Sequence, residues 1–233
     1  MPNNNENDLE KSQNIPINLE LHFNTPIYTV EITDFLDDVT TLSDKIIKDS
    51  NKKPTVDNPL VMTDSFFNDD KVKDFSNFIG QTSWNILSEQ GYDMDNMSVS
   101  FSELWTQEHY KNSYMEQHTH RYGSQIVGFY FLKVPDPTPI ASFYDPRIAA
   151  FQGALKEKNP SELTLASNIV NYIPKEGMFI FTNSWLAHSF SKNTSKKPFS
   201  FVHFNLFAEP DYKNNPTSIK NLCEVEIIWT NIK

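Results

Sequence analysis

The order in which helical and strand-like periodicities follow one another is the feature of this chain that most constrains its fold. Apolar residues recur every three or four positions over about 33–50, as on one face of an amphipathic helix, with Thr33 as the expected N-cap. A second helix is expected over about 69–90, ending at Gly91. From residue 97 onward the pattern changes to short runs rich in Phe, Val, Ile and Tyr, separated by Pro, Asn, Asp and Gly.

The strand-like runs continue almost to the end of the chain. A run of helices followed by a run of strands is typical of the α+β class, with the helices packed on one side of an antiparallel sandwich or barrel. An entry strand is expected over 19–32, and a short helix or loop interrupts the later strands at 149–159. The later strands are predicted at 97–107, 124–134, 141–146, 167–174, 177–183, 186–190, 197–209 and 223–231.

Length and composition predict one folded domain preceded by a polar arm. The chain has 233 residues, which is enough for one full hydrophobic core. Residues 1–18 are rich in Asn and Glu and have almost no apolar side chains, so we expect them to form a disordered arm. A single domain is expected over 19–233, with its β core at about 97–231.

Charge and cysteine content bound the partners and the compartment. The net charge is −10, which disfavours nucleic acid as a partner because phosphate binding needs basic side chains. Cys223 is the only cysteine, so no intramolecular disulfide can form, as is usual in a reducing cytoplasm. The N-terminal stretch does not resemble a signal peptide, and no apolar run approaches the roughly 20 residues that span a bilayer. We therefore expect a cytoplasmic protein without a membrane partner.

The stretch "MEQHTHRYG" holds a pair of histidines with one residue between them. On an extended segment His118 and His120 would point to the same face, where two imidazoles can chelate a divalent metal. Imidazole suits iron, zinc, copper and nickel. Two polar residues in a surface loop would give the same pattern, so the pair alone does not decide the question.

A third histidine strengthens the metal hypothesis. His188 lies 70 positions after His118, beyond a turn at Pro174 and Gly177 and an apolar strand. A close pair on one strand and a distant histidine on a late strand is how the double-stranded β-helix arranges three metal ligands on one face. We therefore expect this jelly-roll or cupin-like barrel, with the N-terminal helices on one side. A buried, hydrogen-bonded core histidine is the alternative for His188.

A fourth histidine lies on the last long strand-like run. Period-two alternation places Phe199, Phe201, His203 and Asn205 on one face. If that face lines the pocket, His203 could contact a substrate or support the site. A buried histidine satisfied by hydrogen bonds is an equal alternative.

Seven segments in order, over roughly residues 21–207, carry a resemblance to a known family. They resemble the 2-oxoglutarate/Fe(II) oxygenases found in marine bacteria and their phages, which look related to prolyl hydroxylases. The segments are "FNTPIYTVEI", "SELWTQ", "HTH", "GFYFLKVPDP", "FYDPR", "PKEGMFIFTNSWLAH" and "FSFVHFN".

The resemblance implies a catalytic iron site formed by His118, His120 and His188. It implies Fe(II), 2-oxoglutarate and O2, with ascorbate as the reductant in vitro, and an oxidative decarboxylation coupled to hydroxylation of a substrate. Most 2-oxoglutarate oxygenases have Asp or Glu where this chain has His120. Either the site has three histidines, or Asp145 supplies a carboxylate, or His120 only supports a ligand, and three histidines is the favoured interpretation.

The cosubstrate anchor departs from the family pattern. The family usually places an Arg at the start of its last strand, where a guanidinium holds the distal carboxylate of 2-oxoglutarate, and the equivalent residue here is Phe199. The resemblance leaves Lys133, Lys197 and Arg147 as candidate cations, with Lys197 equally explained as part of a solvated turn. Asn205 ends the motif of the last strand and is assigned to cofactor binding with them.

Two other function classes stay open at this point. Three histidines with an open position also form a zinc hydrolase site, in which bound water becomes acidic. A non-catalytic β-sandwich, such as a virion or interaction module with a decayed site, is the third interpretation, and the loss of the usual Arg favours it. For the oxygenase, the prime substrate is expected to be a peptide or a small metabolite, in the cytoplasm of a bacterium or a phage-infected host.

Overall fold

The structure is a computed structural model that describes residues 16–120, 123–147 and 155–211. Its α-helices are α1 (Leu36–Asp49) and α2 (Lys73–Glu89), the latter entered through a 3-10 turn, η1 (Asp70–Val72). Its strands are β1 (Ile27–Glu31), β2 (Leu60–Met62), β3 (Met97–His109), β4 (Met115–His118), β5 (Ile126–Lys133), β6 (Ala141–Tyr144), β7 (Ile169–Tyr172), β8 (Met178–Asn183), β9 (His188–Phe190) and β10 (Phe199–Pro210).

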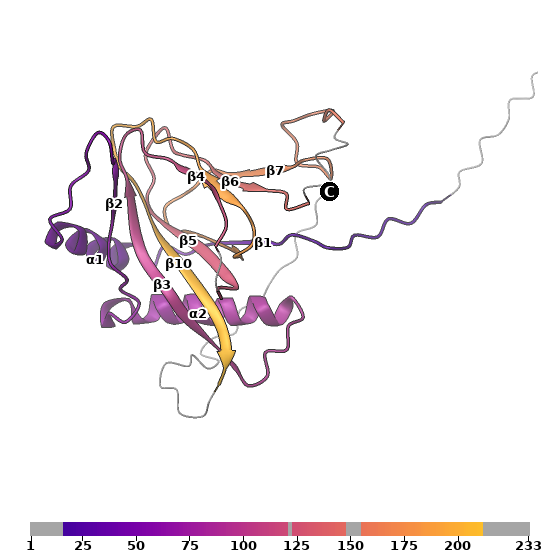
Figure 1. The fold of residues 1–233 in the computed structure, drawn as a ribbon, viewed down its shortest axis with the longest axis horizontal. Helices are drawn as coiled ribbons and strands as arrows, with labels where there is room; N and C mark the ends of the chain where they lie inside the picture. Colours follow the sequence, from indigo (N-terminus) through magenta and orange to yellow (C-terminus); the bar gives the residue numbers. More distant parts are fainter. Residues whose placement is uncertain (1–15, 121–122, 148–154, 212–233) are drawn as a thin grey trace, which may run out of the picture.

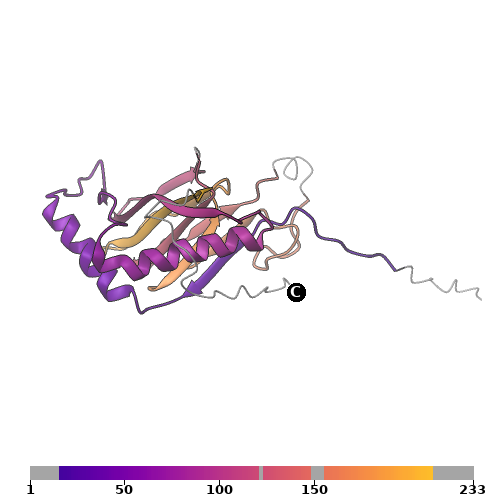
Figure 2. The same cartoon turned by 90° about the horizontal axis from the view of Figure 1, so that it is seen from below.

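The strands form two antiparallel sheets. The larger has six strands in the order β1-β8-β5-β10-β3-β2, and the smaller has four in the order β4-β9-β6-β7. Figure 1 shows β4, β6 and β7 on one side of the long strands β3 and β10, and helix α2 on the other side. Figure 2 shows α2 running along the larger sheet. The predicted α+β arrangement, with helices on one side of an antiparallel β core, is confirmed.

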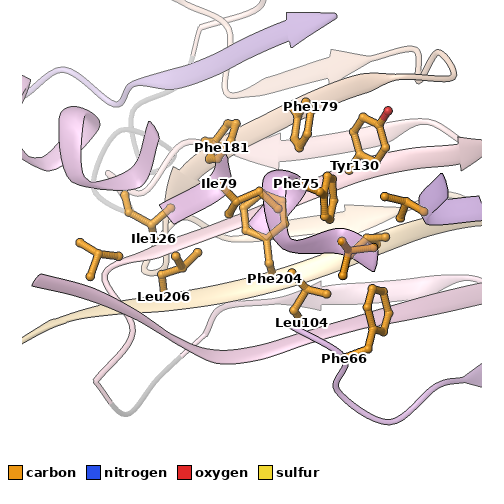
Figure 3. Packing of buried hydrophobic residues seen from close by; sticks show 14 of the residues in the cluster. Phe66, Phe75, Ile79, Leu104, Ile126, Tyr130, Phe179, Phe181, Phe204 and Leu206 are labelled. Atoms are coloured by element: carbon orange, nitrogen blue, oxygen red, sulfur yellow. The ribbon is translucent and has the colours of Figure 1, made fainter. Parts of the chain in front are cut away.

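The central strands β8, β5 and β10 of the larger sheet are buried on both faces over most of their length, and alternation along them divides the core in two. On β5, Tyr130 and Leu132 belong to the cluster beneath the helices, whereas Phe129 and Phe131 belong to the cluster between the two sheets. Successive side chains of a strand point to opposite faces, so one strand can fill both layers. Figure 3 shows the helix-side layer, where Phe75 of α2 lies among phenyl rings of the sheet.

Gly128 sits where the larger sheet leaves no room for a side chain. A Cβ atom there would lie 2.3 Å from the ring of Phe204 and 2.5 Å from the carbonyl oxygen of Ile180. The backbone oxygen cannot move without breaking the pairing of β5 with β8. The glycine in the middle of β5 therefore lets the Phe204 ring lie over this strand on the helix side of the sheet.

Several predicted boundaries were wrong. The entry strand begins at Ile27 rather than residue 19, and α1 begins at Leu36. Thr33 does not cap the helix with its side chain: its carbonyl accepts a hydrogen bond from the Leu36 amide, and Phe35 occupies the N-cap. The edge strand β2 was not predicted, because a three-residue strand is too short to show a period.

The α2 end at Gly91 is confirmed: the helix stops at Glu89 and Gly91 has a φ of 89°. Of the predicted interruption at 149–159, residues 155–159 are described and contain no helix. The last predicted strand, 223–231, lies outside the described residues, as does most of the expected arm at 1–18. The division into an arm and one domain over 19–233 stays a prediction. Among the described residues, no helix combines the length and apolar character needed to cross a membrane.

We predict that Gly128→Ala lowers the free energy of unfolding by about 2–3 kcal/mol, because the new methyl group overpacks a core that cannot yield. Gly91→Ala is the comparison: Gly91 has open space around it, so the new methyl group meets no neighbour, and the strain at its φ of 89° should cost only about 1 kcal/mol. Urea titrations of both variants check this. Equal losses would show that the Phe204 ring can move aside.

Candidate metal centre

Strand pairing in the smaller sheet brings the three predicted histidines together. His118 ends β4 and lies directly opposite His188, the first residue of β9. His120 follows two residues after β4, and its amide donates a hydrogen bond to the Ser184 carbonyl at 2.9 Å. The pairing of β4 with β9 is irregular between Met115 and His118. This irregularity turns the side chains of Met115 and His118 towards the space between the sheets.

The imidazoles face one another at metal-binding separations. One ring nitrogen from each of His118, His120 and His188 lies within 4.8 Å of the other two. The Nε2 atoms of His120 and His188 are 3.3 Å apart, and their rings are stacked at 8° with centroids 5.2 Å apart. The centroids of His118 and His188 are 4.5 Å apart. Three nitrogens converging on one point is an arrangement that can hold a metal ion.

Hydrogen bonds to backbone carbonyls fix two of the rings in the tautomer that can bind a metal through Nε2. Nδ1 of His118 is 2.8 Å from the Glu116 carbonyl, and Nδ1 of His188 is 3.0 Å from the Leu186 carbonyl. A carbonyl only accepts, so Nδ1 carries the proton in each ring and Nε2 keeps its lone pair. Metal-ligating histidines are usually oriented by such a bond from the other nitrogen.

Burial keeps His120, His188 and the neighbouring His203 neutral. Burial, and then the neighbouring His118, lower the pKa of His188 to about 3 and the pKa of His120 to about 4. Burial also lowers the pKa of His203 well below its usual value. Neutral imidazole is the ligating form, so at neutral pH no proton has to leave these rings before a metal binds.

No carboxylate joins the cluster among the described residues. Asp145, the candidate fourth group, is engaged by Arg147, whose guanidinium Nη2 and Nε donate to the carboxylate at 2.7–3.1 Å. Those hydrogen bonds lower the pKa of Asp145. The donor set that the structure brings together is therefore three histidines.

The candidate cations lie elsewhere. Lys133 points to the helix side of the larger sheet, where its Nζ is 2.5 Å from Asp44 and 3.0 Å from Glu108. Lys197 is exposed in the turn before β10. Arg147 is exposed and paired with Asp145. Phe199 is fully buried at the position expected for the anchoring Arg.

Phenyl rings surround the inner side of the histidines. Phe129 and Phe143 lie 5.2 and 5.9 Å from the His188 ring, centroid to centroid. Behind them, Phe190 and Phe201 are stacked at 4.7 Å. The cluster is therefore dry on its inner side, while His118 and His120 stay partly exposed.

A second set of polar side chains lies beside the cluster, and only part of it was predicted from the sequence. His203 is buried and its ring centroid is 4.8 Å from that of His120. Neither ring nitrogen makes a hydrogen bond of regular geometry, although the Gly128 backbone lies close enough to interact with the ring. Trp105 Nε1 and Asn205 Oδ1 are likewise buried without a partner. The alternation on β10 placed His203 and Asn205 on the pocket face. Trp105, which lies opposite His203 on β3, belongs to the "SELWTQ" segment of the resemblance, but the sequence did not assign it to the site.

Comparison with known proteins identifies the region that holds this site. A family model described as "Putative 2OG-Fe(II) oxygenase" matches residues 103–205, a span that contains all three histidines. Among curated protein sequences, no relative matches the chain.

Two solved structures share the fold. HygX from Streptomyces hygroscopicus, with nickel and 2-oxoglutarate bound, superposes with a TM-score of 0.51 at 10% identity, covering 78% of this chain and 83% of its own. The non-heme α-ketoglutarate-dependent epimerase SnoN from nogalamycin biosynthesis superposes with a TM-score of 0.53 at 12% identity, covering 89% and 90%. The predicted double-stranded β-helix is confirmed by these similarities.

We predict that His120→Ala and His188→Ala each weaken binding of a divalent metal by more than about 100-fold. Loss of an outer partner of a ligand already costs about 10–100-fold, and loss of a ligand should exceed that. Calorimetric titration with Mn²⁺ measures the change, and His22→Ala, an exposed histidine outside the cluster, is the control. Unchanged affinity in His120→Ala would show that His120 only supports a ligand.

We predict that Lys133→Met lowers stability by about 2 kcal/mol, because Glu108 would keep a buried carboxylate without its cation. The affinity of the metal-loaded protein for 2-oxoglutarate should not change. Lys175→Met is the control, since its ion pair with Glu31 is exposed on both sides and should cost well under about 1 kcal/mol. Lost cosubstrate affinity with unchanged stability would instead make Lys133 the anchor.

Proposed function

We propose that this chain, of which residues 103–205 match a family model described as "Putative 2OG-Fe(II) oxygenase", binds ferrous iron through His118, His120 and His188. It couples the oxidative decarboxylation of 2-oxoglutarate to hydroxylation of a C–H bond in a second substrate. The observation that carries the proposal is the convergence of three ring nitrogens within 4.8 Å, inside the matched span.

The donor set fits iron(II). Imidazole nitrogen is a suitable donor for ferrous iron, and three ligands on one side leave positions for cosubstrate and oxygen. The carbonyl bonds to His118 and His188 hold each Nε2 ready without a change of tautomer. Bound iron would supply the electrons that activate O2 while 2-oxoglutarate is oxidised to succinate and CO2.

The chain's own residues orient the reactants and exclude water. The phenyl rings behind the histidines lower the local dielectric, which strengthens every electrostatic interaction inside the site. Three neutral ligands leave both charges of a divalent metal uncompensated, whereas a carboxylate ligand would remove one. The site therefore favours an anionic cosubstrate, and a dianionic 2-oxo acid meets that requirement.

The alternative functions are less well supported. A zinc hydrolase is not favoured, because the matched family is an oxygenase family. A module with a decayed site is not favoured either, because all three imidazoles retain metal-binding geometry.

The prime substrate is proposed to be a peptide or a small metabolite, since the net charge of −10 disfavours nucleic acid. A reducing cytoplasm is the proposed compartment. It suits a chain with one cysteine, and it also keeps iron in the ferrous state.

We predict that purified protein with Fe(II) and ascorbate converts 2-oxoglutarate slowly to succinate even without a prime substrate, and that His188→Ala abolishes this. Succinate is measured by chromatography, and His22→Ala should match the wild type. Metal analysis of protein purified anaerobically accompanies the assay. Iron-loaded wild-type protein that forms no succinate would overturn the proposal. Protein that contains zinc and does not bind iron would also overturn it.

A further inference from the structure

The face of β10 that points towards the histidine cluster, its pocket face, is apolar at one end of the strand and polar at the other. At one end, Phe199 and Phe201 are fully buried and pack against phenyl rings of β5 and β9. At the other end, His203 and Asn205 are buried with polar atoms that have no partner. At the first end the polar neighbours are Gln107 and His109 of β3, and His109 is already hydrogen-bonded to Gln107 and Ser113. The buried polar atoms that remain without a partner lie at the second end.

Unpartnered buried atoms are concentrated at this polar end. Of the eight such side-chain atoms in the described part of the chain, four belong to Trp105, His203 and Asn205. The other four are single hydroxyl oxygens of Thr40, Thr82, Ser83 and Ser98. Buried polar groups in proteins are almost always hydrogen-bonded, so a concentration of unpaired ones marks a place where a ligand completes the set.

Trp105 and His203 lie beside the metal centre rather than in it. They are direct partners in the pairing of β3 with β10, and their ring centroids are 5.0 Å apart. The His203 ring is 4.8 Å from that of His120. His203 nevertheless does not belong to the set of three nitrogens that converge. A group held by Trp105 and His203 would therefore adjoin the metal.

The free atoms define the chemistry of that group. The indole N–H of Trp105 only donates. A neutral His203 keeps one N–H, which the Gly128 backbone approaches without forming a hydrogen bond of regular geometry. Two donors are complementary to a carboxylate, which only accepts. Asn205 turns its amide N–H towards Glu103 at 2.7 Å, and its free Oδ1 is an acceptor that cannot bind a carboxylate. The two donors are thus Trp105 and His203.

We propose that Trp105 and His203 form a neutral two-donor subsite for the carboxylate that adjoins the oxo group of the 2-oxo acid. This inference rests on the proposed function and deepens it. The cosubstrate is recognised at its metal-proximal end by uncharged donors, while the position of the usual distal anchor is occupied by Phe199. The positive charge that balances the carboxylate comes from the metal rather than from an arginine.

The test compares two acids that share this end. 2-Oxopentanoate has the same five-carbon chain as 2-oxoglutarate but lacks the distal carboxylate. Dissociation constants of both acids are measured by calorimetry on Mn²⁺-loaded protein, without turnover, for the wild type, Trp105→Phe and His203→Leu. Trp84→Phe is the matched control, because the Trp84 indole donates to the Met97 carbonyl on the helix side.

We expect Trp105→Phe and His203→Leu to weaken both acids in parallel, by about tenfold or more each, since a hydrogen bond to a charged group is lost. Trp84→Phe should bind both acids as the wild type does. Three results would overturn the inference: unchanged affinities, weakening of 2-oxoglutarate alone, or loss of Mn²⁺ affinity in His203→Leu, which would make His203 a ligand.

A second readout separates this role from a structural one. Because each substitution removes an unpartnered buried atom, the Tm of the metal-free protein should not fall in His203→Leu. In Trp105→Phe it should fall less than in Trp84→Phe, which loses the same ring volume and a hydrogen bond as well. A larger fall that accompanies the loss of acid binding would mean that these residues hold the fold instead. Should His203→Leu not fold, Trp105→Phe alone decides the outcome. If the wild type binds Mn²⁺ but neither acid, the proposed function fails; if it binds both and the variants match it, only the subsite fails.

Discussion

Strands β5 and β10 have no exposed face, and the rest of the structure depends on how their two faces are covered. The helix-side face is covered by α2, whose Phe75 packs against the rings of Tyr130 and Phe179. That layer leaves the other face free to support the smaller sheet through a second set of phenyl rings. His118 and His188 lie on strands of this smaller sheet, and His120 follows two residues after β4. The positions of all three therefore depend on the packing of the phenyl layer beneath them.

The electrostatics of the centre follow from the same burial. A carboxylate in this apolar space would need a metal or a cation at all times, because an isolated buried charge is costly. Neutral imidazoles can remain buried without a metal, and the carbonyl bonds to His118 and His188 keep them ordered. The consequence is a more electropositive centre once a divalent ion is bound, which couples metal binding to the capture of an anion.

Much of this could be predicted from the sequence, because periodicity determines which side chains share a face. The helices and most of the strands follow from it, whereas the convergence of His118 with His188 was predicted from the ligand arrangement of the double-stranded β-helix. The strand that carries His118 also has a feature that periodicity cannot detect. β4 is irregular between Met115 and His118, and this bulge changes which residues of the strand point inward.

A similar irregularity explains why Lys133, a predicted cosubstrate anchor, lies on the helix side of the larger sheet. Alternation from Phe129 and Phe131 would place Lys133 on the pocket face. The pairing of β5 with β10 shifts there, with Ser200 opposite Lys133 and Phe201 opposite Phe131. The extra residue turns Lys133 to the helix side, where Asp44 and Glu108 bind it. One unpaired residue in a ladder reverses the face, and nothing in the local sequence marks it.

The polar end of the pocket is expensive for the fold taken alone. Each unsatisfied buried polar atom costs about 1–3 kcal/mol, and a domain of this kind is stable by only about 5–15 kcal/mol. Four such atoms on Trp105, His203 and Asn205 would consume a large part of that margin. Leu and Phe would fill the same space at lower cost, as the neighbouring positions on β10 show. Residues that oppose stability at one end of an otherwise apolar face are best understood through what they bind, and they adjoin the only three-histidine cluster in the described residues.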